Sequence, residues 1–568
     1  MSRPVPRANP ALGPLADRAT SRRTGVGSLR ILARLPRLLC AALAGLSLAG
    51  CLKRETAVQR GNREQVLHRG VGNEVTELDP HLVTGVAEGN VLRALFEGLV
   101  TEDPVDLRPV PGVAERWELS PDGLVYTFFL RANARWSNGE PVTAQDFVTS
   151  FRRILTPSLA ADYANLLYIL QGAEAFHKGT NPDFSRVGAT ALDPRTLRLT
   201  LEHPAPYFLS LLTNPPFYPV PLATISRHGS AYQRGNPWTR PGRIVTNGAF
   251  TLQKWQPHQV IVVEKFAGYW DAATVRLNAI HFYPIDSVDA EERAFRAGQL
   301  HLTEFVPVGK IDAYRRDSPH LLRTDPYLGT YFFRFNVRRP PLNDVRVRRA
   351  FALAVDREAI VTKVLRGGQR PAHALTPPGT AGYTAVARVP TDFAAARQVL
   401  AEAGFPGGRG FPTLELLYNT SENHRIVAEA IQEMWRRELG IEVRLTNQEM
   451  KVTQAARRAG EYQILRSDWI GDYLDPATFL EVFRSDSGNN YTGWSHREYD
   501  AALFAAARTA DPVARAALLQ KAEAILLAEV PFLPLYHYTH VFLLQPSVKG
   551  WHHNLLDHHP YKHVWLEP

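Results

Sequence analysis

The sequence predicts an α/β protein built of two lobes and an additional, more β-rich insertion. Its 568 residues exceed what one hydrophobic core usually serves, because domains run to roughly 100–200 residues. Between residues 330 and 540, helical and extended patterns alternate, which is typical of an α/β domain with its ligand edge at the carboxyl ends of the strands. Earlier in the chain short alternating segments predominate, and a proline-rich passage at 214–221 marks a boundary.

The first half of the chain is predicted to contain mainly short strands. Alternating apolar and polar residues indicate strands near 67 and at 117–119, 125–130, 196–201, 248–255, 259–265 and 280–284. Helical spacing predicts helices through 91–96, ending at Gly98, and at 291–297. A third helix is expected to begin at the capping pattern that Thr143 forms with Asp146.

The second half is predicted to alternate helices with strands. Helices are expected at 344–355, 393–403, 422–439 and from residue 512, and strands at 330–336, 414–418, 442–445 and 462–465. Asp344 and Asp511 stand where amino-terminal caps are expected, and Pro512 suits a first helical position. Gly404 and Gly440 are expected to end two of these helices.

The positive charge of the chain is concentrated at its N-terminus. The formal net charge is +9, of which residues 1–50 carry +7 and the remaining residues +2. Because so small a charge provides no basic face, nucleic-acid binding is not predicted. The two cysteines, Cys40 and Cys51, also lie near the N-terminus, so neither a disulfide framework nor a cysteine zinc site is predicted beyond them.

Residues 1–50 are predicted to be a signal peptide. Three arginines precede an uncharged run at 38–50, which is too short to span a bilayer as a mature helix. The run ends Leu-Ala-Gly before Cys51 and resembles a bacterial lipobox, in which the cysteine becomes the lipidated first residue. An ordinary secretory signal that contains a cysteine is the alternative. With Cys51 lipidated, residues 51–65 tether a bacterial, exported protein in the periplasm or cell envelope, at the inner or the outer membrane.

The stretch 466–473, Arg-Ser-Asp-Trp-Ile-Gly-Asp-Tyr, is the candidate ligand-binding segment. An apolar run leads into it and an Asp-Pro turn signal follows it, so we expect a strand that ends in an irregular loop. Arg466 and Asp472 offer opposite charges to the two ends of a zwitterion, while Trp469 and Tyr473 offer apolar walls. The alternative is a strand end whose aromatic rings belong to the core and whose charges are solvated.

A set of short motifs, in a fixed order, resembles one protein family. The motifs are Leu-Asp-Pro at 78–80, Leu-Phe-Glu-Gly-Leu at 95–99, Ser-Pro-Asp-Gly at 120–123, the run 136–147, Val-Thr-Asn-Gly-Ala-Phe at 245–250, Gly-Thr-Tyr at 329–331, Asp-Val-Arg-Val-Arg at 344–348, Tyr-Asn-Thr-Ser-Glu-Asn-His at 418–424 and Leu-Thr-Asn-Gln-Glu at 445–449. From about residue 66 to 560 the chain is similar to the periplasmic oligopeptide-binding proteins, which are the solute receptors of ATP-driven peptide importers.

The resemblance implies the two-lobe periplasmic-binding-protein fold, with a hinge and a third domain. By this resemblance residues 66–103, 220–324 and 541–568 form lobe I, residues 104–219 the inserted domain and residues 325–540 lobe II. The lobes are expected to close around an extended peptide, whose backbone adds to protein strands and whose side chains occupy hydrated pockets. The implied partners are short peptides, a membrane permease with its ATPase subunits, and the membrane through the lipid anchor. The protein is expected to be a monomer.

The resemblance also implies roles for individual residues. Asp472 pairs with the amino terminus of the peptide, Arg466 meets the carboxyl end of short peptides, and His424 serves longer ones. The other expected peptide contacts are Tyr163, Tyr327, Phe332, Met450, Trp469, Ile470, Gly471 and Tyr473. Met450 departs from the family pattern because tryptophan is frequent at its position, and a flexible thioether predicts a wider or differently shaped pocket. Arg334 replaces a frequently acidic residue, so it favours acidic peptide side chains if it faces the cleft and has no such effect if it faces solvent.

Three other functions compete with peptide delivery. Five histidines, His552, His553, His558, His559 and His563, make a metal-chelate receptor of the nickel type and the same fold one alternative. Neither a cysteine nor a paired carboxylate accompanies them, so no metal and no other cofactor is predicted. A tethered peptide sensor or murein-peptide receptor is the second alternative. An enzyme is not predicted, because the zincin, serine-hydrolase, P-loop and dinucleotide motifs are absent from the sequence.

Overall fold

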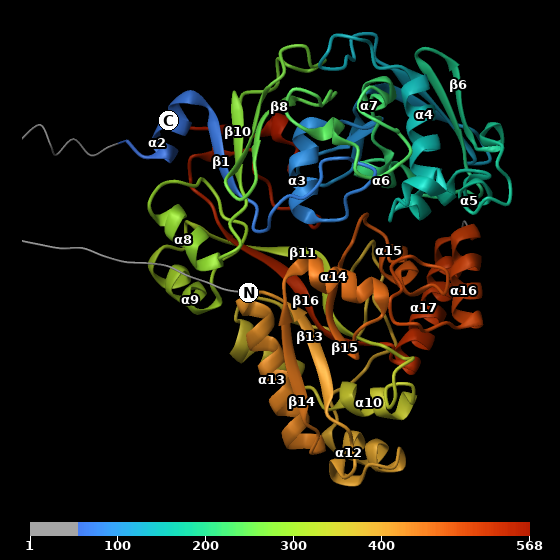
Figure 1. Ribbon diagram of the computed structural model, residues 1–568, viewed down its shortest axis with the longest axis vertical. Coiled ribbons are helices and arrows are strands. Elements are labelled where there is room, and N and C mark those ends of the chain that lie inside the picture. Colours follow the sequence, from blue (N-terminus) through green and yellow to red (C-terminus); the bar gives the residue numbers. More distant parts are fainter. Residues whose placement is uncertain (1–54, 510) are drawn as a thin grey trace, which may run out of the picture. The chain divides into compact units, whose positions relative to one another are not determined.

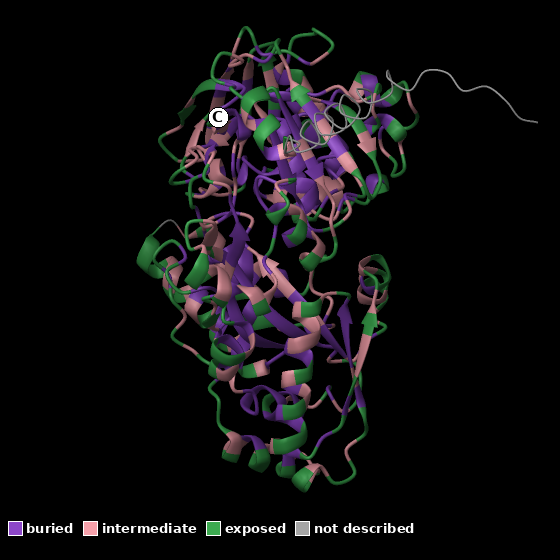
Figure 2. Cartoon of the chain, turned by 90° about the vertical axis from the view of Figure 1, so that its left-hand side faces the viewer, coloured by how far each residue is buried: buried purple, intermediate pink, exposed green. Residues whose placement is uncertain are grey.

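The structure, a computed structural model, describes residues 55–509 and 511–568. The predicted signal peptide, Cys51 and the start of the predicted tether lie outside the described residues. Thr56–Pro568 cluster as one unit, whose sheets and helices are drawn in Figure 1. Figure 2 shows that the buried residues follow the strands, whereas exposed residues gather on the outer turns of helices and in loops. Among the described helices none is long and apolar enough to cross a membrane.

The first hydrophobic core is built from residues 67–302 and from the end of the chain, residues 542–566, with Tyr473 added. One sheet on this core has the order β1 (Val66–Gly70), β10 (Ala279–Tyr283), β9 (Val260–Lys265), β8 (Phe250–Gln256). Strand β1 pairs in parallel with β10, and the other pairs are antiparallel. A second, antiparallel sheet has the order β4 (Ala114–Leu119), β5 (Val125–Leu130), β7 (Thr196–Thr200), β6 (Ala189–Asp193). Two-stranded pairs join β2 (Val100–Glu102) to β3 (Pro109–Pro111) and β17 (Val548–Lys549) to β18 (Trp565–Leu566).

The second core surrounds one six-stranded mixed sheet. Its order is β12 (Arg370–Pro371), β16 (Phe532–Leu543), β11 (Leu322–Phe335), β15 (Ile464–Ile470), β13 (Leu414–Asn419), β14 (Val443–Gln448). The long strands β11 and β16 pair from one end to the other, with register shifts after Pro326 and after Tyr331. At one end of this pair Val541 and Leu543 of β16 belong to a small third cluster. The predicted domain cuts at 325 and 540 therefore fall inside two paired strands, and the domain division stays a prediction.

Several of the helices begin at caps that the sequence indicates. The α-helices are α2 (Ala57–Glu64), α3 (Val86–Leu95), α4 (Ala144–Leu155), α5 (Ala173–His177), α6 (Phe208–Leu211), α7 (Leu222–Ser226), α8 (Val288–Arg296), α9 (Val308–Asp317), α10 (Val345–Leu353), α11 (Arg357–Ala359), α12 (Phe393–Glu402), α13 (Glu422–Leu439), α14 (Met450–Ala459), α15 (Ala477–Leu480), α16 (Arg497–Arg508) and α17 (Pro512–Glu529). At α4 the backbone N–H of Thr143 donates to the Asp146 carboxylate at 2.7 Å, as the capping pattern predicts. Asp344 and Asp511 cap α10 and α17.

Three sequence expectations need correction. Strand β15 does not end at residue 465 but continues to Ile470, because its polar residues pair with β11 from Phe335 to Gly329. Helix α3 ends at Leu95 rather than Gly98, since Phe96 already has extended backbone angles. Strand β16 and helices α9, α14 and α16 were not among the expected elements. In α14 only Thr453 is buried, so the apolar stripe that identifies a helix in sequence is almost missing.

Candidate ligand-binding site

Strand β15 presents the candidate residues on two opposite faces. Successive side chains of a strand point to opposite sides of the sheet. Arg466, Asp468 and Ile470 therefore share one face, while Ser467 and Trp469 share the other. The predicted cluster of charges and rings is thus split into two places, and the irregular backbone begins only at Gly471.

Asp472 lies in the loop after β15, with its backbone held from two sides. Its N–H donates to Thr478 Oγ1 at 3.0 Å, and its carbonyl accepts from Asn214 Nδ2 at 2.9 Å. The next residue, Tyr473, is buried in the first core and stacks on Tyr207 with ring centroids 5.1 Å apart. The backbone of the loop is therefore held by Thr478, six residues later, and by Asn214 and Tyr207, which are far away in the sequence.

A cavity of about 20 Å³ adjoins the Asp472 side chain. Its walls include Tyr163 and Leu166 from one part of the chain and Trp469, Tyr473 and Glu481 from the other. A cavity needs roughly 10–15 Å³ to hold a water molecule, so this space fits water and no peptide residue. A larger ligand requires the two sets of walls to move apart.

The Asp472 side chain is partly buried, and it has no ion-pair partner among the described residues. Burial raises its pKa to about 7, although a hydrogen bond from Tyr163 and the distant Arg93 charge act in the opposite direction. Burial and the neighbouring Asp472 raise the pKa of Tyr163 well above its usual value, so this phenol remains a donor. An ammonium group from outside would supply the missing positive charge.

Arg466 lies on the face of β15 opposite to Trp469, and its side chain already has hydrogen-bond partners within the protein. Its Nη2 donates to Asp468 Oδ2 at 3.0 Å and to the Tyr538 hydroxyl at 2.9 Å, and its Nη1 lies 3.4 Å from Asn419 Oδ1. Its guanidinium carbon lies 4.7 Å from the ring centroid of Tyr331. Burial opposes the charge, but the Asp468 carboxylate outweighs it and raises the pKa of Arg466. The Nε atom is buried and has no hydrogen-bond partner among the described residues.

His424 lies beside Arg466, in the first turn of α13. Its Nδ1 is 3.4 Å from the Tyr331 hydroxyl. Burial, and then the Arg466 charge, hold its pKa well below the usual value, so the ring is neutral. Tyr327 comes from β11, and its ring centroid lies 6.2 Å from that of Tyr538. His424 and Tyr327 therefore lie next to Tyr331 and Tyr538, the two tyrosines that contact Arg466.

Gly471 and Ile470 have geometric reasons for their identity, and Met450 lies apart from them. A Cβ on Gly471 would come within 2.7 Å of Leu328, whose carbonyl accepts the Gly471 N–H at 2.7 Å. Ile470 pairs with Gly329 across the sheet. Met450 is the first residue of α14 and is partly buried.

A model of one family matches residues 108–491 of the chain, under the description "Bacterial extracellular solute-binding proteins, family 5 Middle". The chain is also 38% identical over 521 residues to the periplasmic oligopeptide-binding protein OppA of Salmonella typhimurium, covering 90% of this chain and 94% of OppA. The chain belongs to the family 5 solute-binding proteins. Family 5 proteins bind solutes and are not enzymes, as the sequence predicts for this chain.

Solved structures of family members share the fold. The structure of the Escherichia coli murein tripeptide binding protein MppA has a TM-score of 0.83 and 36% identity, covering 88% of this chain and 98% of MppA. Haemophilus influenzae OppA in complex with the peptide RPPGFSPFR has a TM-score of 0.81 and 32% identity, covering 89% of this chain and 99% of that one. The predicted two-lobe periplasmic-binding-protein fold is confirmed.

Phe332 and Arg334 are both buried in this family 5 chain. The Phe332 ring packs on Phe483 and Phe532 in the second core, so we leave it out of the proposed peptide contacts. Arg334 faces neither solvent nor the Asp472 cavity, and it donates to Ser467 Oγ at 2.8 Å and to the Asn489 carbonyl at 2.9 Å. Burial lowers the pKa of Arg334 to about 10.

The C-terminal histidines are spread over several protein contacts. His559 Nε2 lies 2.7 Å from Asp557, and its ring stacks on Trp551. His558 Nδ1 lies 2.9 Å from the Glu102 carboxylate. Among the described residues no group of three or more histidine, cysteine or acidic side chains could hold a metal ion.

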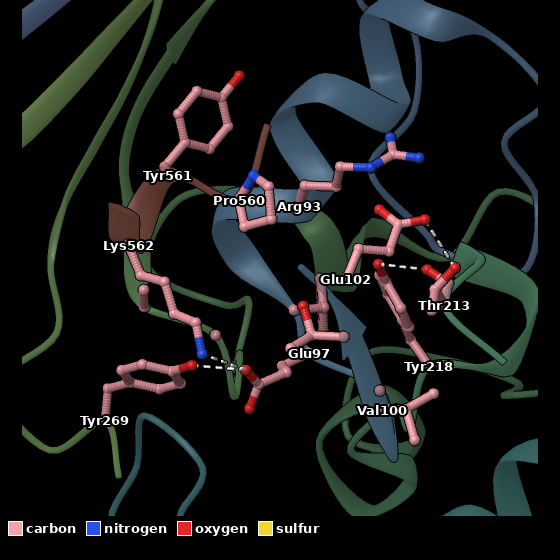
Figure 3. Close-up of a pocket in the computed structure, with 15 residues that line it drawn as sticks. Arg93, Glu97, Val100, Glu102, Thr213, Tyr218, Tyr269, Pro560, Tyr561 and Lys562 are labelled. Atoms are coloured by element: carbon pink, nitrogen blue, oxygen red, sulfur yellow. Dashed lines mark hydrogen bonds and ion pairs between the residues drawn. The ribbon is translucent and has the colours of Figure 1, made fainter. Parts of the chain in front are cut away.

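A second cavity, of about 40 Å³, lies within the first core (Figure 3). Glu97 accepts hydrogen bonds at 2.5 Å from both Tyr269 and the Trp270 indole, and Lys562 lies 3.8 Å away. On the other side of the cavity Glu102 accepts from Thr213 at 2.9 Å. The buried carboxylates that line it thus have protein partners, in contrast to Asp472.

Sequence reasoning missed three residues that complete the site. Tyr538 and Asn419 contact Arg466 from β16 and β13, which no local pattern could reveal. Glu481 lines the Asp472 cavity nine positions after Asp472 in the chain. From the sequence alone, Asp468 has no predicted role. A predicted strand that continued to Ile470 would have placed Arg466 and Asp468 on the same face, because residues two apart in a strand point to the same side.

Proposed function

We propose that this protein is an extracytoplasmic receptor that captures short peptides and delivers them to an ATP-driven permease. The observation that carries the proposal is the partly buried Asp472 carboxylate, which lines a cavity, has no ion-pair partner among the described residues and has a pKa raised to about 7. Leaving such a group unpaired is costly, and the ammonium of a peptide amino terminus would remove that cost. Arg466, whose side chain is 9% exposed, supplies the complementary charge for a carboxyl end.

The other proposed peptide contacts follow the family resemblance. In the proposed complex Trp469, Ile470, Gly471 and Tyr473 contact the amino-terminal part of the peptide, and Tyr163 closes over it. His424, Tyr327 and Met450 are proposed to contact longer peptides. The relatives named oligopeptide-binding and murein tripeptide binding proteins support a peptide as the ligand.

The cellular setting of the proposed receptor follows from its N-terminal sequence. Residues 1–50 direct export and Cys51 carries the lipid anchor. The predicted tether, residues 51–65, ends in the folded helix α2 (Ala57–Glu64) and links a monomeric receptor to a membrane of the cell envelope. Lobe I (66–103, 220–324, 541–568) and lobe II (325–540) close on the peptide, with the inserted domain (104–219) beside them. The closed form is the one that docks on the permease and its ATPase subunits.

Native mass spectrometry of the purified protein tests the proposed ligand class. We expect co-purifying peptides of about two to five residues, since a ligand that bridges Asp472 and Arg466 is short. After denaturation and refolding to remove them, isothermal titration calorimetry with trialanine, tetraalanine and pentaalanine should restore binding. Absence of peptide from the native spectrum, together with no binding heat for all three peptides, would overturn the proposal.

Peptide affinity should depend on pH through Asp472. The free carboxyl group has a pKa of about 7, so below pH 7 it is protonated and must lose its proton to pair with an ammonium. Affinity for trialanine should therefore fall by about tenfold per pH unit below pH 7. Above about pH 8 it should fall again, because the peptide amine deprotonates. Calorimetric Kd values at pH 5.5, 6.5, 7.5 and 8.5 would show this, and a constant affinity from pH 5.5 to 7.5 would contradict it.

A further inference from the structure

Asp468 contributes a second, more exposed carboxylate at the Arg466 end of the site. Its side chain is 38% exposed, whereas that of Arg466 is 9% exposed. Both of its hydrogen bonds within the described residues are accepted at Oδ2, from Arg466 at 3.0 Å and from Tyr538 at 3.2 Å. Asp468 therefore neutralises the guanidinium that is proposed to receive the peptide carboxylate.

A peptide carboxylate bound at Arg466 would change the balance of charge around the Arg466–Asp468 ion pair. Before binding, one positive and one negative charge face each other. The other groups that contact Arg466 are uncharged, namely the amide of Asn419 and the phenols of Tyr331 and Tyr538, and the neighbouring His424 is neutral. A bound carboxylate adds a second negative charge beside a single guanidinium, and two like charges at close range repel one another unless a further cation joins them.

We propose that Asp468 is a specificity-determining residue that selects peptides whose last residue carries a cationic side chain. This rests on the proposed function, in which Arg466 receives the carboxyl end. In such a complex the peptide carboxylate takes Arg466 donors, and the ammonium or guanidinium of the last side chain takes the exposed Asp468 carboxylate. Two positive and two negative charges then balance, and each contact is a charge-assisted hydrogen bond.

The selection acts on the carboxyl end of the peptide and not on its amino end. Asp468 shares a strand face with Arg466 and Ile470 and is not among the residues that line the Asp472 cavity. A cationic side chain on the first residue of a tripeptide lies next to Asp472, so Asp468 does not select it. The position of the cation in the peptide is thus part of the inference.

Calorimetry with three tripeptides tests the inference on the refolded, peptide-free protein at pH 7.5. The peptides are Ala-Ala-Ala, Ala-Ala-Lys and Lys-Ala-Ala, and the variants are Asp468→Asn and Asp486→Asn. The wild type should bind Ala-Ala-Lys about tenfold more tightly than Ala-Ala-Ala, a typical effect of one charge-assisted contact. Asp468→Asn should abolish this ratio and leave the ratio of Lys-Ala-Ala to Ala-Ala-Ala unchanged. Asp486→Asn removes an aspartate that pairs with Arg484, and it should preserve both ratios.

A ligand comparison keeps the inference testable even if Asp468→Asn does not fold. Acetylation of the Ala-Ala-Lys side chain removes its charge and keeps its stem, so it should cost the wild type the same tenfold. Equal wild-type affinities for Ala-Ala-Lys and Ala-Ala-Ala would overturn the inference. So would an Asp468→Asn effect of equal size on all three peptides, because Asp468 would then only position Arg466. Binding of all peptides without the expected ratios leaves the peptide-receptor function standing, whereas absence of any binding refutes that function and this inference together.

Discussion

Asp472→Asn should weaken the binding of free-amine tripeptides by about 30-fold to 4,000-fold. The amide has nearly the shape of the carboxylate but no charge, so the peptide ammonium would be buried without a partner. Removing one member of a buried, hydrogen-bonded charge pair at an interface costs about 2–5 kcal/mol, and 1.4 kcal/mol corresponds to a tenfold change in affinity. The backbone contacts of Asp472 to Thr478 and Asn214 do not involve its carboxylate, so the loop should keep its position.

N-acetylated peptides provide the matched comparison for this variant. Acetyl-trialanine carries no ammonium, so it should bind the wild type weakly and lose little further affinity in Asp472→Asn. Calorimetric Kd values for trialanine and acetyl-trialanine in both proteins give the four numbers required. If the substitution weakened both peptides by the same factor, Asp472 would be a structural residue of the loop and not the amine-binding group. The acid limb of the pH profile should also disappear in the variant, because the group that titrates near pH 7 is gone.

The sequence predicted the elements whose signals are local. Helix α13 has the expected bounds, and α4, α10 and α17 begin at the expected caps, because capping depends on side chains three residues apart. Strand β16 was not expected, and it contains Pro534, a residue that removes a hydrogen-bond donor and argues against a central strand. The strand tolerates it at a register shift, where Phe332 is opposite Pro534. Such a shift depends on the partner strand, which no local pattern contains.

The site could be predicted by its residue types but not by its arrangement. The charges of Arg466 and Asp472 suggested a receptor for a zwitterion, and the structure gives each a different environment. Asp472 has no counter-ion among the described residues, whereas Arg466 is paired with Asp468. The difference arises from the length of β15, which places Arg466 and Asp468 on one face and ends before Asp472. Element boundaries are the least reliable part of a prediction from sequence, and here a five-residue error at the end of β15 hides the pairing.

Arg153→Met should destabilise the protein by about 3–5 kcal/mol, the usual cost of leaving a buried charge without its partner. Arg153 and Asp79 are 0% and 3% exposed. The guanidinium donates to both Asp79 oxygens, at 2.9 and 2.5 Å, and its Nε donates to the Ala231 carbonyl at 2.7 Å. The Trp238 indole also donates to Asp79, at 3.0 Å. This ion pair therefore joins three separate parts of the sequence, around residues 79, 153 and 231–238.

The double variant Asp79→Asn, Arg153→Met separates the cost of an unpaired charge from the cost of lost packing. Without the carboxylate no charge is left buried, so the double variant should be more stable than Arg153→Met alone. Differential scanning calorimetry at pH 7 should therefore give the order wild type, double variant, Arg153→Met in falling Tm. Arg116→Met, at an exposed pair with Glu118, should leave Tm nearly unchanged, because surface ion pairs contribute about 0–1 kcal/mol. A double variant less stable than Arg153→Met would show that the hydrogen bonds that Asp79 accepts from the Trp238 indole and from the His81 backbone N–H, at 3.0 and 3.1 Å, matter more than its charge.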